Sequence, residues 1–331
     1  MVAKARIING RQVAEDVKRH VAESAAKLAS AGRRPKLAAV QVGRDPASEL
    51  YIRMQERNCR QVGIDHELVA LPDSTSRDEL GRRIEGLNAD RSVTAMIIQM
   101  PLPDHLDARE LQTLIAPAKD AEGVSPANMG KLFYDDYAIA PCTALATLAL
   151  LKTVCDDLAG KEVVIVGHSE IFGKPLAAMM LASRAGSPSV AVCHVATRDL
   201  KAHTRRAEIL IVAAGASQRR WLSYSSALQA GREADRPDIG PLIKADHLRR
   251  GGIVIDVAIN RIPRALDADG RPTRDQWGAE QMVTTGDVDY DAALRRKVSA
   301  ITPVPGGVGP VTVAMLLRNV VTCANLSAGQ G

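Results

Sequence analysis

A short apolar run that ends in a glycine turn and leads into a helix restricts the fold of this chain more than any other feature. Residues 163–175 read Val-Val-Ile-Val-Gly-His-Ser-Glu-Ile-Phe-Gly-Lys-Pro. A strand that is apolar at every position is typical of a parallel sheet covered on both faces. Gly167 lets the backbone turn tightly beside a phosphate, Ser169 can donate its hydroxyl, and Gly173 begins a helix whose first amides favour an anion. We therefore expect this segment to bind the phosphates of a dinucleotide. The spacing differs from G-x-G-x-x-G, so a glycine turn without a ligand is the alternative.

Strands and helices alternate along the rest of the chain. The apolar pattern predicts strands at 37–42, 66–71, 93–100, 162–166, 189–193, 209–213 and 253–257. Helical spacing predicts helices at 10–30, 48–62, 76–87, 142–158, 173–185 and 309–322. Repeated strand–helix–strand units imply parallel sheets, so we expect an α/β protein with a Rossmann-type domain. A length of 331 residues is enough for two domains.

Residues 217–239 fit neither pattern. The segment is polar and contains several arginines. Long irregular stretches in compact domains are usually lids or disordered insertions. We expect a disordered or surface segment here, with a functional lid as the alternative.

Composition narrows the class of protein. Hydrophobic residues make up 46% and charged residues 24%, which argues against a disordered chain. Apolar runs fall short of the about 18 residues that span a bilayer, and residues 1–8 lack the apolar region of a signal peptide. The five cysteines are widely spaced without a C-x-x-C pair, which predicts free thiols and no metal site. We expect a cytoplasmic protein with no membrane partner.

The net charge of +5 raises nucleic acid as a possible partner. The basic residues are interspersed with 38 acidic ones, and aromatic residues amount to only 3%. Few side chains are therefore available for bases to stack on. We expect no nucleic-acid partner and a surface that favours small anionic ligands.

Four polar residues of the first third form a second candidate group. Tyr51 and Gln55 are four residues apart and share one face of the predicted helix. Gln99 ends a predicted strand, where open parallel sheets place their ligands. Glu122 precedes Gly123 in a loop, where its carboxylate can accept hydrogen bonds from a ligand. Each residue also has a purely structural alternative, since a helix tyrosine usually packs and a glutamine is usually solvated.

Several strings in a fixed order identify a family. They are Gly-Arg-Asp-Pro-Ala-Ser at 43–48, the Tyr51 helix, Gln-Met-Pro-Leu-Pro at 99–103, Pro-Cys-Thr at 141–143, Gly-His-Ser at 167–169 and Ile-Thr-Pro-Val-Pro-Gly-Gly-Val-Gly-Pro at 301–310. Together they closely resemble the bifunctional methylenetetrahydrofolate dehydrogenase/cyclohydrolase family of folate one-carbon metabolism. The resemblance runs from about residue 7 to residue 319.

The resemblance implies a domain plan and a chemistry. Residues 1–145 would form a catalytic, folate-binding domain completed by the C-terminal helix 309–325. Residues 146–300 would form an NAD(P)-binding Rossmann-like domain with the insertion 217–239. The active site would lie in the cleft between the domains, and family members are usually homodimers. The reaction is oxidation of 5,10-methylenetetrahydrofolate with NAD or NADP, followed by hydrolysis of the methenyl product to 10-formyltetrahydrofolate.

The resemblance also assigns roles to residues. The catalytic group comprises Tyr51, Gln55, Gln99 and Glu122. Folate binding falls to Tyr51, Gln99, Glu122, Pro305 and Gly306. Cofactor binding falls to Gly167, His168, Ser169, Gly173, Val195, Ile259, Gly309 and Thr312.

The chain departs from the family where the hydrolysis takes place. The family has a lysine four residues after the helix tyrosine, and this chain has Gln55. A glutamine does not exchange a proton near neutral pH, and losing such a group typically reduces the rate by about 10²–10⁴. We therefore predict weak or absent cyclohydrolase activity. Hydride transfer to a nicotinamide needs no protein base, so the dehydrogenase can persist.

The residues that the family uses to bind the 2′-phosphate of NADP also differ. His168 replaces an arginine and Val195 replaces a serine, which makes NAD a credible cofactor. Arg198 or an arginine of 217–239 could compensate, which keeps NADP open.

Three other functions remain open at this point. One is a full bifunctional enzyme with a different proton relay, such as water held by Tyr51 and Gln99. Another is a non-catalytic binder of folate or dinucleotide. The last is an enzyme for another reduced pterin, since Glu122 replaces the family's aspartate and alanines stand at 144, 146 and 258.

Overall fold

The chain folds into two compact units, seen in a computed structural model that describes residues 4–44, 46–182 and 186–328, without the side chains of residues 46–51. Unit 1 comprises Met1–Arg11 and Thr147–Pro310, and unit 2 comprises Gln12–Ala146 and Val311–Gly331. The α/β class with parallel sheets, predicted from the strand–helix alternation, is confirmed.

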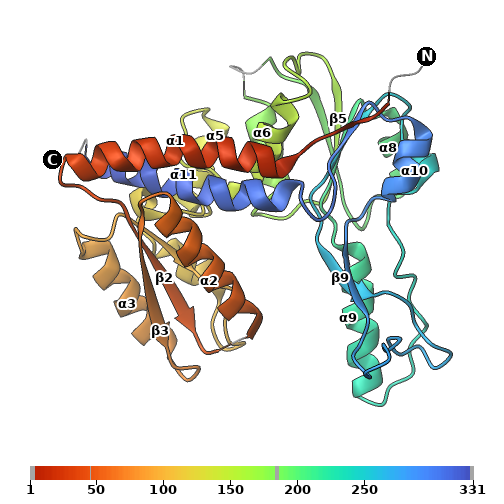
Figure 1. Ribbon diagram of the computed structural model, residues 1–331, viewed down its shortest axis with the longest axis horizontal. Coiled ribbons are helices and arrows are strands. Elements are labelled where there is room, and N and C mark those ends of the chain that lie inside the picture. The colour runs from red at the N-terminus through yellow and green to blue at the C-terminus, as the bar shows by residue number, and fades with distance from the viewer. Residues whose placement is uncertain (1–3, 45, 183–185, 329–331) are drawn as a thin grey trace. The chain divides into compact units, whose positions relative to one another are not determined.

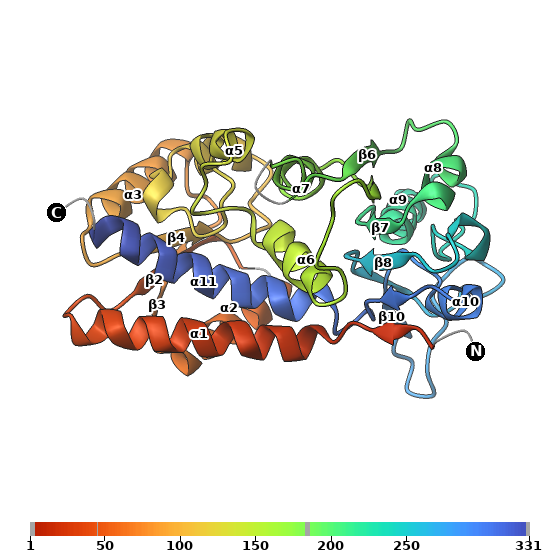
Figure 2. The same cartoon turned by 90° about the horizontal axis from the view of Figure 1, so that it is seen from above.

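Unit 2 is built on a three-stranded parallel sheet in the order β3-β2-β4. Its elements are α1 (Gly10–Ser30), β2 (Lys36–Val42), α2 (Pro46–Gln61), β3 (Asp65–Leu71), α3 (Arg77–Ala89), β4 (Ala95–Ile98), α4 (Ala108–Thr113), η1 (Pro117–Lys119), α5 (Pro126–Phe133), the start of α6 (Cys142–Lys152) and most of α11 (Val308–Ala328). The helices α1 and α11 run side by side in both views (Figures 1 and 2).

The sequence explains the packing of this sheet. The side chains of β2 are buried from Leu37 to Val42, as expected for a strand covered on both faces. Helix α3 begins where the Ser76 hydroxyl accepts a hydrogen bond from the Glu79 amide. Its buried residues Leu80, Ile84 and Leu87 are spaced four and three apart and pack into the core cluster of the sheet. This core holds the carboxyl ends of β2 and β4 in place.

Unit 1 is built on a six-stranded parallel sheet in the order β1-β11-β8-β7-β5-β6. Its elements are β1 (Arg6–Ile7), most of α6, β5 (Glu162–Val166), α7 (Gly173–Met180), β6 (Ser189–Cys193), α8 (Leu200–Arg206), β7 (Ile209–Val212), α9 (Ala216–Gln229), η3 (Ala245–His247), β8 (Ile253–Asp256), β9 (Asn260–Pro263), β10 (Met282–Thr285), α10 (Tyr290–Arg296) and β11 (Ala300–Ile301). The strands β9 and β10 form a separate antiparallel pair.

The prediction of an irregular segment at 217–239 is wrong for its first half. Residues Ala216–Gln229 form helix α9, which lies beside β9 (Figure 1). Only a narrow stripe of the helix is buried, with Trp221 and Tyr224 at 7% and 6% exposure against Ile262. Arginines and serines occupy its other faces, so the segment has a composition typical of a loop. The helical spacing of its few buried residues is therefore difficult to recognise in the sequence.

Two predicted helices are shorter than expected, and four short strands were not predicted. Helix α6 ends at Lys152 instead of residue 158, and α7 ends at Met180 instead of residue 185. Residues 183–185 lie outside the described part of the chain. The missed strands β1, β9, β10 and β11 have two to four residues each, too few for a periodic pattern.

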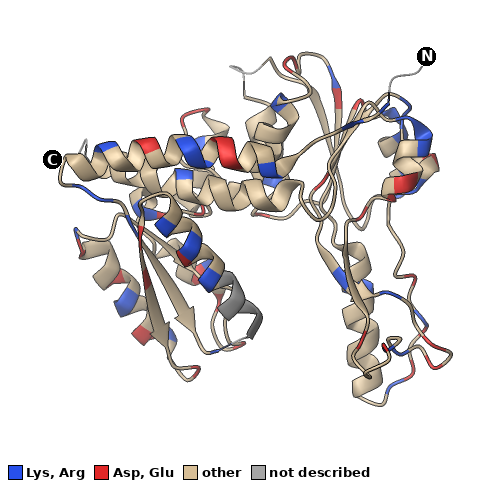
Figure 3. Cartoon of the chain, in the orientation of Figure 1, with Lys and Arg blue, Asp and Glu red and all other residues tan. Residues whose placement is uncertain are grey.

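Among the described residues one helix, Val308–Ser327, is long and apolar enough to cross a membrane, and 61% of that stretch is buried inside the fold. An apolar helix that is mostly buried is typical of the core of a folded domain. Figure 3 marks both basic and acidic positions along α1.

Candidate active site

The glycine turn after β5 has the shape that the sequence predicts. Gly167 has a φ of 125°, and a Cβ there would lie 2.5 Å from the carbonyl oxygen of Ala213. A Cβ on Gly173 would lie 1.9 Å from the carbonyl oxygen of Gly167. Both positions therefore require glycine, because backbone from the turn and from the end of β7 fills the space of a side chain.

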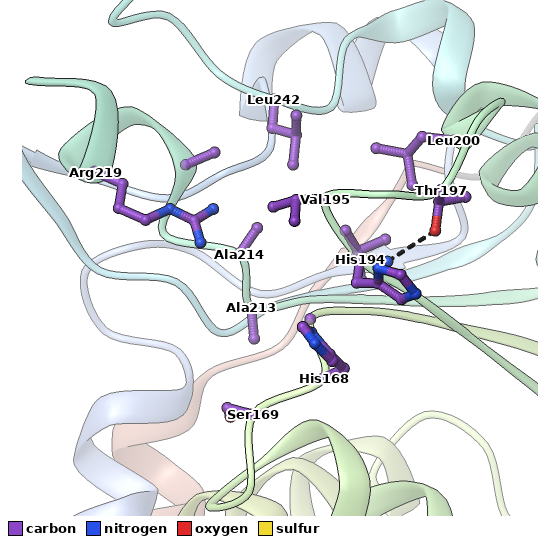
Figure 4. A pocket seen from close by; sticks show the side chains of 13 residues that line it. His168, Ser169, His194, Val195, Thr197, Leu200, Ala213, Ala214, Arg219 and Leu242 are labelled. Carbon is purple, nitrogen blue, oxygen red and sulfur yellow. Dashed lines mark hydrogen bonds between the residues drawn. The ribbon is translucent and has the colours of Figure 1, made fainter. Parts of the chain in front are cut away.

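This turn forms one wall of a cavity of about 380 Å³ at the carboxyl ends of three adjacent strands, β5, β6 and β7 (Figure 4). Ligands of open parallel sheets bind at this edge. The lining residues are Val166, Gly167, His168, Ser169, His194, Val195, Thr197, Leu200, Ala213, Ala214, Ala216, Arg219 and Leu242.

Two histidines of the lining lie close to each other. The rings of His168 and His194 lie 4.8 Å apart between centroids (Figure 4). The backbone amide of His194 donates to Thr197 Oγ1 at 2.9 Å, and its Nδ1 accepts from the Ala196 amide at 3.2 Å. An accepting Nδ1 leaves the proton of a neutral ring on Nε2. Val195 beside it is 81% exposed and offers no hydrogen bond.

The cavity has features that would bind the phosphates of a dinucleotide. The N-cap residue of α7, Phe172, makes no side-chain hydrogen bond. The Lys174 amide donates to the Ser169 carbonyl at 3.2 Å and Pro175 has no amide hydrogen, which leaves the Gly173 amide as the one available to an anion in the described first turn. Ser169 contributes to the lining, and Arg219 from α9 adds a positive charge. The predicted cofactor residues Gly167, His168, Ser169 and Val195 thus line one cavity, while Gly173 begins the helix behind it.

Unit 2 holds a second polar group around Gln55. Gln55 on α2 and Gln99 at the end of β4 are 3% and 5% exposed. Gln99 Nε2 donates to Gln55 Oε1 at 2.9 Å, and Nε2 of His66, on β3, lies 3.1 Å from the same oxygen. The two predicted residues therefore meet, together with a histidine that the sequence did not indicate.

The loop that carries Glu122 runs beside β4, since Asp120 and Met96 form a parallel bridge. The Asp120 carboxylate accepts hydrogen bonds from the amides of Gly123 and Ser125 and from Asn128 Nδ2, at 2.8–3.0 Å. Burial raises the pKa of the Glu122 carboxyl to about 7, and the nearby charge of Asp120 adds to the shift. This loop of unit 2 thus carries an acid whose pKa is raised toward neutrality.

The remaining predicted residues are distributed over both units. Pro305 and Gly306 belong to the loop between β11 and α11, and Gly306 has a φ of 105°. Ile259 is exposed between β8 and β9, and a Cβ on Gly309 would lie 3.8 Å from its Cδ1. Thr312 lies on α11 in unit 2. Tyr51 belongs to α2, but its side chain lies outside the described part of the chain.

Three residues of these groups were not singled out from the sequence. His194 directly follows β6, and its place at a strand end was a usable signal. Arg219 was considered only as one of several arginines of the 217–239 segment. His66 lies eleven residues after Gln55, and no local pattern connects the two.

Comparison with known proteins agrees with this architecture. Residues 8–122 match the family model of the tetrahydrofolate dehydrogenase/cyclohydrolase catalytic domain, and residues 141–220 and 239–328 match that of the NAD(P)-binding domain. The bifunctional protein FolD of Moorella thermoacetica is 40% identical over 320 residues, covering 97% of this chain and 99% of the relative.

Solved structures give the same result. The bifunctional enzyme FolD-methylenetetrahydrofolate dehydrogenase/cyclohydrolase of Campylobacter jejuni has a TM-score of 0.80 and 34% identity, covering 97% of this chain and 99% of that one. The enzyme of Trypanosoma brucei, solved with NADP and an inhibitor, has a TM-score of 0.79 and 31% identity, covering 98% and 99%. From these matches and the cavity at the β5 turn, the chain belongs to the tetrahydrofolate dehydrogenase/cyclohydrolase family, with an NAD(P)-binding domain.

Proposed function

We propose that this protein oxidises 5,10-methylenetetrahydrofolate to methenyltetrahydrofolate with NAD or NADP and hydrolyses the product weakly or not at all. The observation that carries the proposal is the turn at Gly167 and Gly173, where two positions that require glycine bring the backbone to the wall of a cavity. The family membership supplies the substrate class.

The dehydrogenase step does not require a side chain that donates or accepts a proton. When bound, the nicotinamide supplies the acceptor for the hydride, so this step needs no protein base. The turn and α7 hold the phosphates, and Ser169 can donate a hydrogen bond to them. Glu122, once ionised, would stabilise the positive charge that develops on the folate as the hydride leaves.

The hydrolysis step lacks a proton carrier at position 55. Gln55 offers a neutral amide, which can bind but cannot act as a general acid or base near pH 7. Its neighbour Gln99 has the same limit. This chemistry supports an enzyme that releases the methenyl compound unhydrolysed.

The preference for NAD or NADP would depend on which side chains of the cavity bind the 2′-phosphate of NADP. His168 and Val195 stand where the family has an arginine and a serine, and Arg219 brings a guanidinium to the lining. We propose that Arg219 supplies the positive charge that allows the site to accept NADP as well as NAD. Arginine forms strong hydrogen bonds to phosphate oxygens.

A single assay tests the proposal. Purified protein is given methylenetetrahydrofolate with NAD and NADP side by side, and formation of reduced cofactor and of the methenyl compound is recorded. Turnover with at least one cofactor is expected, with the methenyl product accumulating. The absence of turnover with both cofactors would refute the dehydrogenase. Methenyl hydrolysis well above the uncatalysed rate would favour the bifunctional alternative.

We further propose a homodimer in the cytoplasm, as the family usually forms and as free thiols suit a reducing compartment. Light scattering should give twice the mass of the chain, and a monomeric mass at micromolar concentration would contradict the dimer.

A further inference from the structure

The amide of Gln55 is held in one orientation by two neighbours. Gln99 Nε2 donates to Gln55 Oε1 at 2.9 Å, and His66 Nε2 lies 3.1 Å from the same oxygen. A carbonyl oxygen carries no proton, so His66 must carry its proton on Nε2 and donate it. In this arrangement of Gln99 and His66 both lone pairs of Oε1 are in use, and rotation of the Gln55 amide by itself would break two hydrogen bonds.

His66 reaches this position from another element. It lies on β3, while Gln55 lies on α2 and Gln99 at the end of β4. Burial lowers the pKa of His66, and the charge of Glu56 opposes this in part. The ring is therefore neutral at physiological pH, with a single N–H directed at Gln55.

The other end of the amide has no partner among the described residues. Gln55 Nε2 is buried and makes no hydrogen bond to any described residue. Gln41 on β2 carries a second amide nitrogen of this kind and is 7% exposed. Gln41 and Gln99 follow the paired residues Val40 and Ile98, so they lie next to each other on adjacent strands.

Buried amide groups without a partner are rare in folded proteins, since each lacks the hydrogen bonds that water would give it. Here two of them lie near the carboxyl end of one parallel sheet, where ligands bind. A ligand with acceptor atoms, such as the carbonyl oxygens and ring nitrogens of a reduced folate, would satisfy them. The group around Gln55 is therefore a set of neutral donors.

We propose that His66 is a positioning residue, which locks the Gln55 amide so that its NH₂ group donates a hydrogen bond to an acceptor atom of the bound reduced folate. The proposal rests on the proposed function in taking a folate as the ligand. It assigns position 55 a role that needs no proton exchange, namely ligand binding, and makes that role depend on a side chain from β3.

The test measures binding instead of turnover. The affinity of the intact protein for 5-formyltetrahydrofolate is measured by calorimetry for the wild type, His66→Ala, His66→Gln, Gln55→Ala and the double variant His66→Ala/Gln55→Ala. The matched control is His20→Ala, since His20 is exposed on α1 and bonds only the Asp16 carbonyl. Thermal midpoints report the stability of each variant.

We expect His66→Ala to weaken binding roughly tenfold, the size of one lost hydrogen bond to a neutral group. His66→Gln places an amide N–H at a similar reach and should restore most of the affinity. In the Gln55→Ala background, His66→Ala should have no further effect, because the amide that it orients is gone.

Two results would overturn the role of His66 alone. One is unchanged affinity in His66→Ala with a lowered thermal midpoint, which would mark a purely structural residue. The other is an equal loss with and without Gln55. A wild type that neither binds the folate nor turns over methylenetetrahydrofolate would overturn the proposed function and this inference together.

Discussion

Replacing Gln55 by lysine introduces an ammonium group where the structure has a neutral amide, and this change should raise the rate of methenyl hydrolysis. The new Nζ would lie near Gln99 and His66, whose nitrogens now lie 2.9 and 3.1 Å from Gln55 Oε1. A lysine needs acceptors in place of these donors. A half-turn of the Gln99 amide presents its oxygen, and moving the His66 proton to Nδ1 frees Nε2 to accept. Both neighbours can therefore adapt without moving the backbone.

The expected gain in hydrolysis rate depends on how far burial lowers the pKa of the new lysine. The Gln55 side chain is 3% exposed, so a lysine there would lose hydration, which lowers its pKa from 10.4 by up to about 3–5 units in fully buried sites. A lysine with a pKa nearer to neutrality can act as a general acid or base. Such a group contributes about 10²–10⁴ in rate, or about 3–5 kcal/mol of the barrier. We expect hydrolysis to rise within that range.

The assay follows the loss of methenyltetrahydrofolate absorbance at a fixed pH. Gln55→Met is the matched control, since methionine has a similar length and no exchangeable proton. Dehydrogenase turnover at saturating folate is recorded in both variants as a check that each remains folded and active, because hydride transfer itself does not use the new group. If Gln55→Lys hydrolyses no faster than Gln55→Met while both keep their thermal midpoints, the missing lysine does not explain weak hydrolysis.

Three further predictions concern the cofactor cavity and the acid of unit 2. Gly167→Ala forces a Cβ to within 2.5 Å of the Ala213 oxygen at a φ of 125°. The variant should lose dinucleotide binding in calorimetry, and its free energy of unfolding should fall by about 1–3 kcal/mol. Tight binding by the variant would refute phosphate binding at the Gly167 turn. Arg219→Ala should weaken NADP binding roughly tenfold and leave NAD binding unchanged, and an equal loss for both would remove Arg219 from 2′-phosphate recognition. Glu122, with a pKa of about 7, should make the KM for the folate fall as pH rises through 7, since the carboxylate is the better acceptor, and Glu122→Gln should flatten this profile.

The pKa of Glu122 also carries a consequence for stability. The folded value of about 7 lies above the ordinary value of 4.5, so the folded protein binds more protons than the unfolded chain between these pH values. The stabilisation is complete below pH 4.5 and is lost as the pH rises toward 7. Denaturant midpoints of wild type and Glu122→Gln across this window measure the effect, and parallel profiles would contradict it.

Local patterns were sufficient for the longer strands and for several of the helices, whereas the short helices α4, α5, α8 and α10 were not predicted. The strands β2, β3, β5 and β6 lie within one residue of their predicted bounds, because buried parallel strands are marked by continuous apolar runs. Short strands such as β11 escaped, since two residues have no periodicity. Helix α9 escaped because only a narrow stripe of it, including Trp221 and Tyr224, is buried.

The sequence by itself determined the α/β class, the family and the glycine turn at Gly167. These depend on contacts between residues near in the chain, where each residue type has a strong conformational preference. Only the tertiary structure placed Arg219 in the cavity and His66 against Gln55. A side chain that hydrogen-bonds across from another strand or helix satisfies no local preference, so nothing in its own neighbourhood marks it. The role proposed for position 55 therefore became visible only when α2, β3 and β4 were brought together.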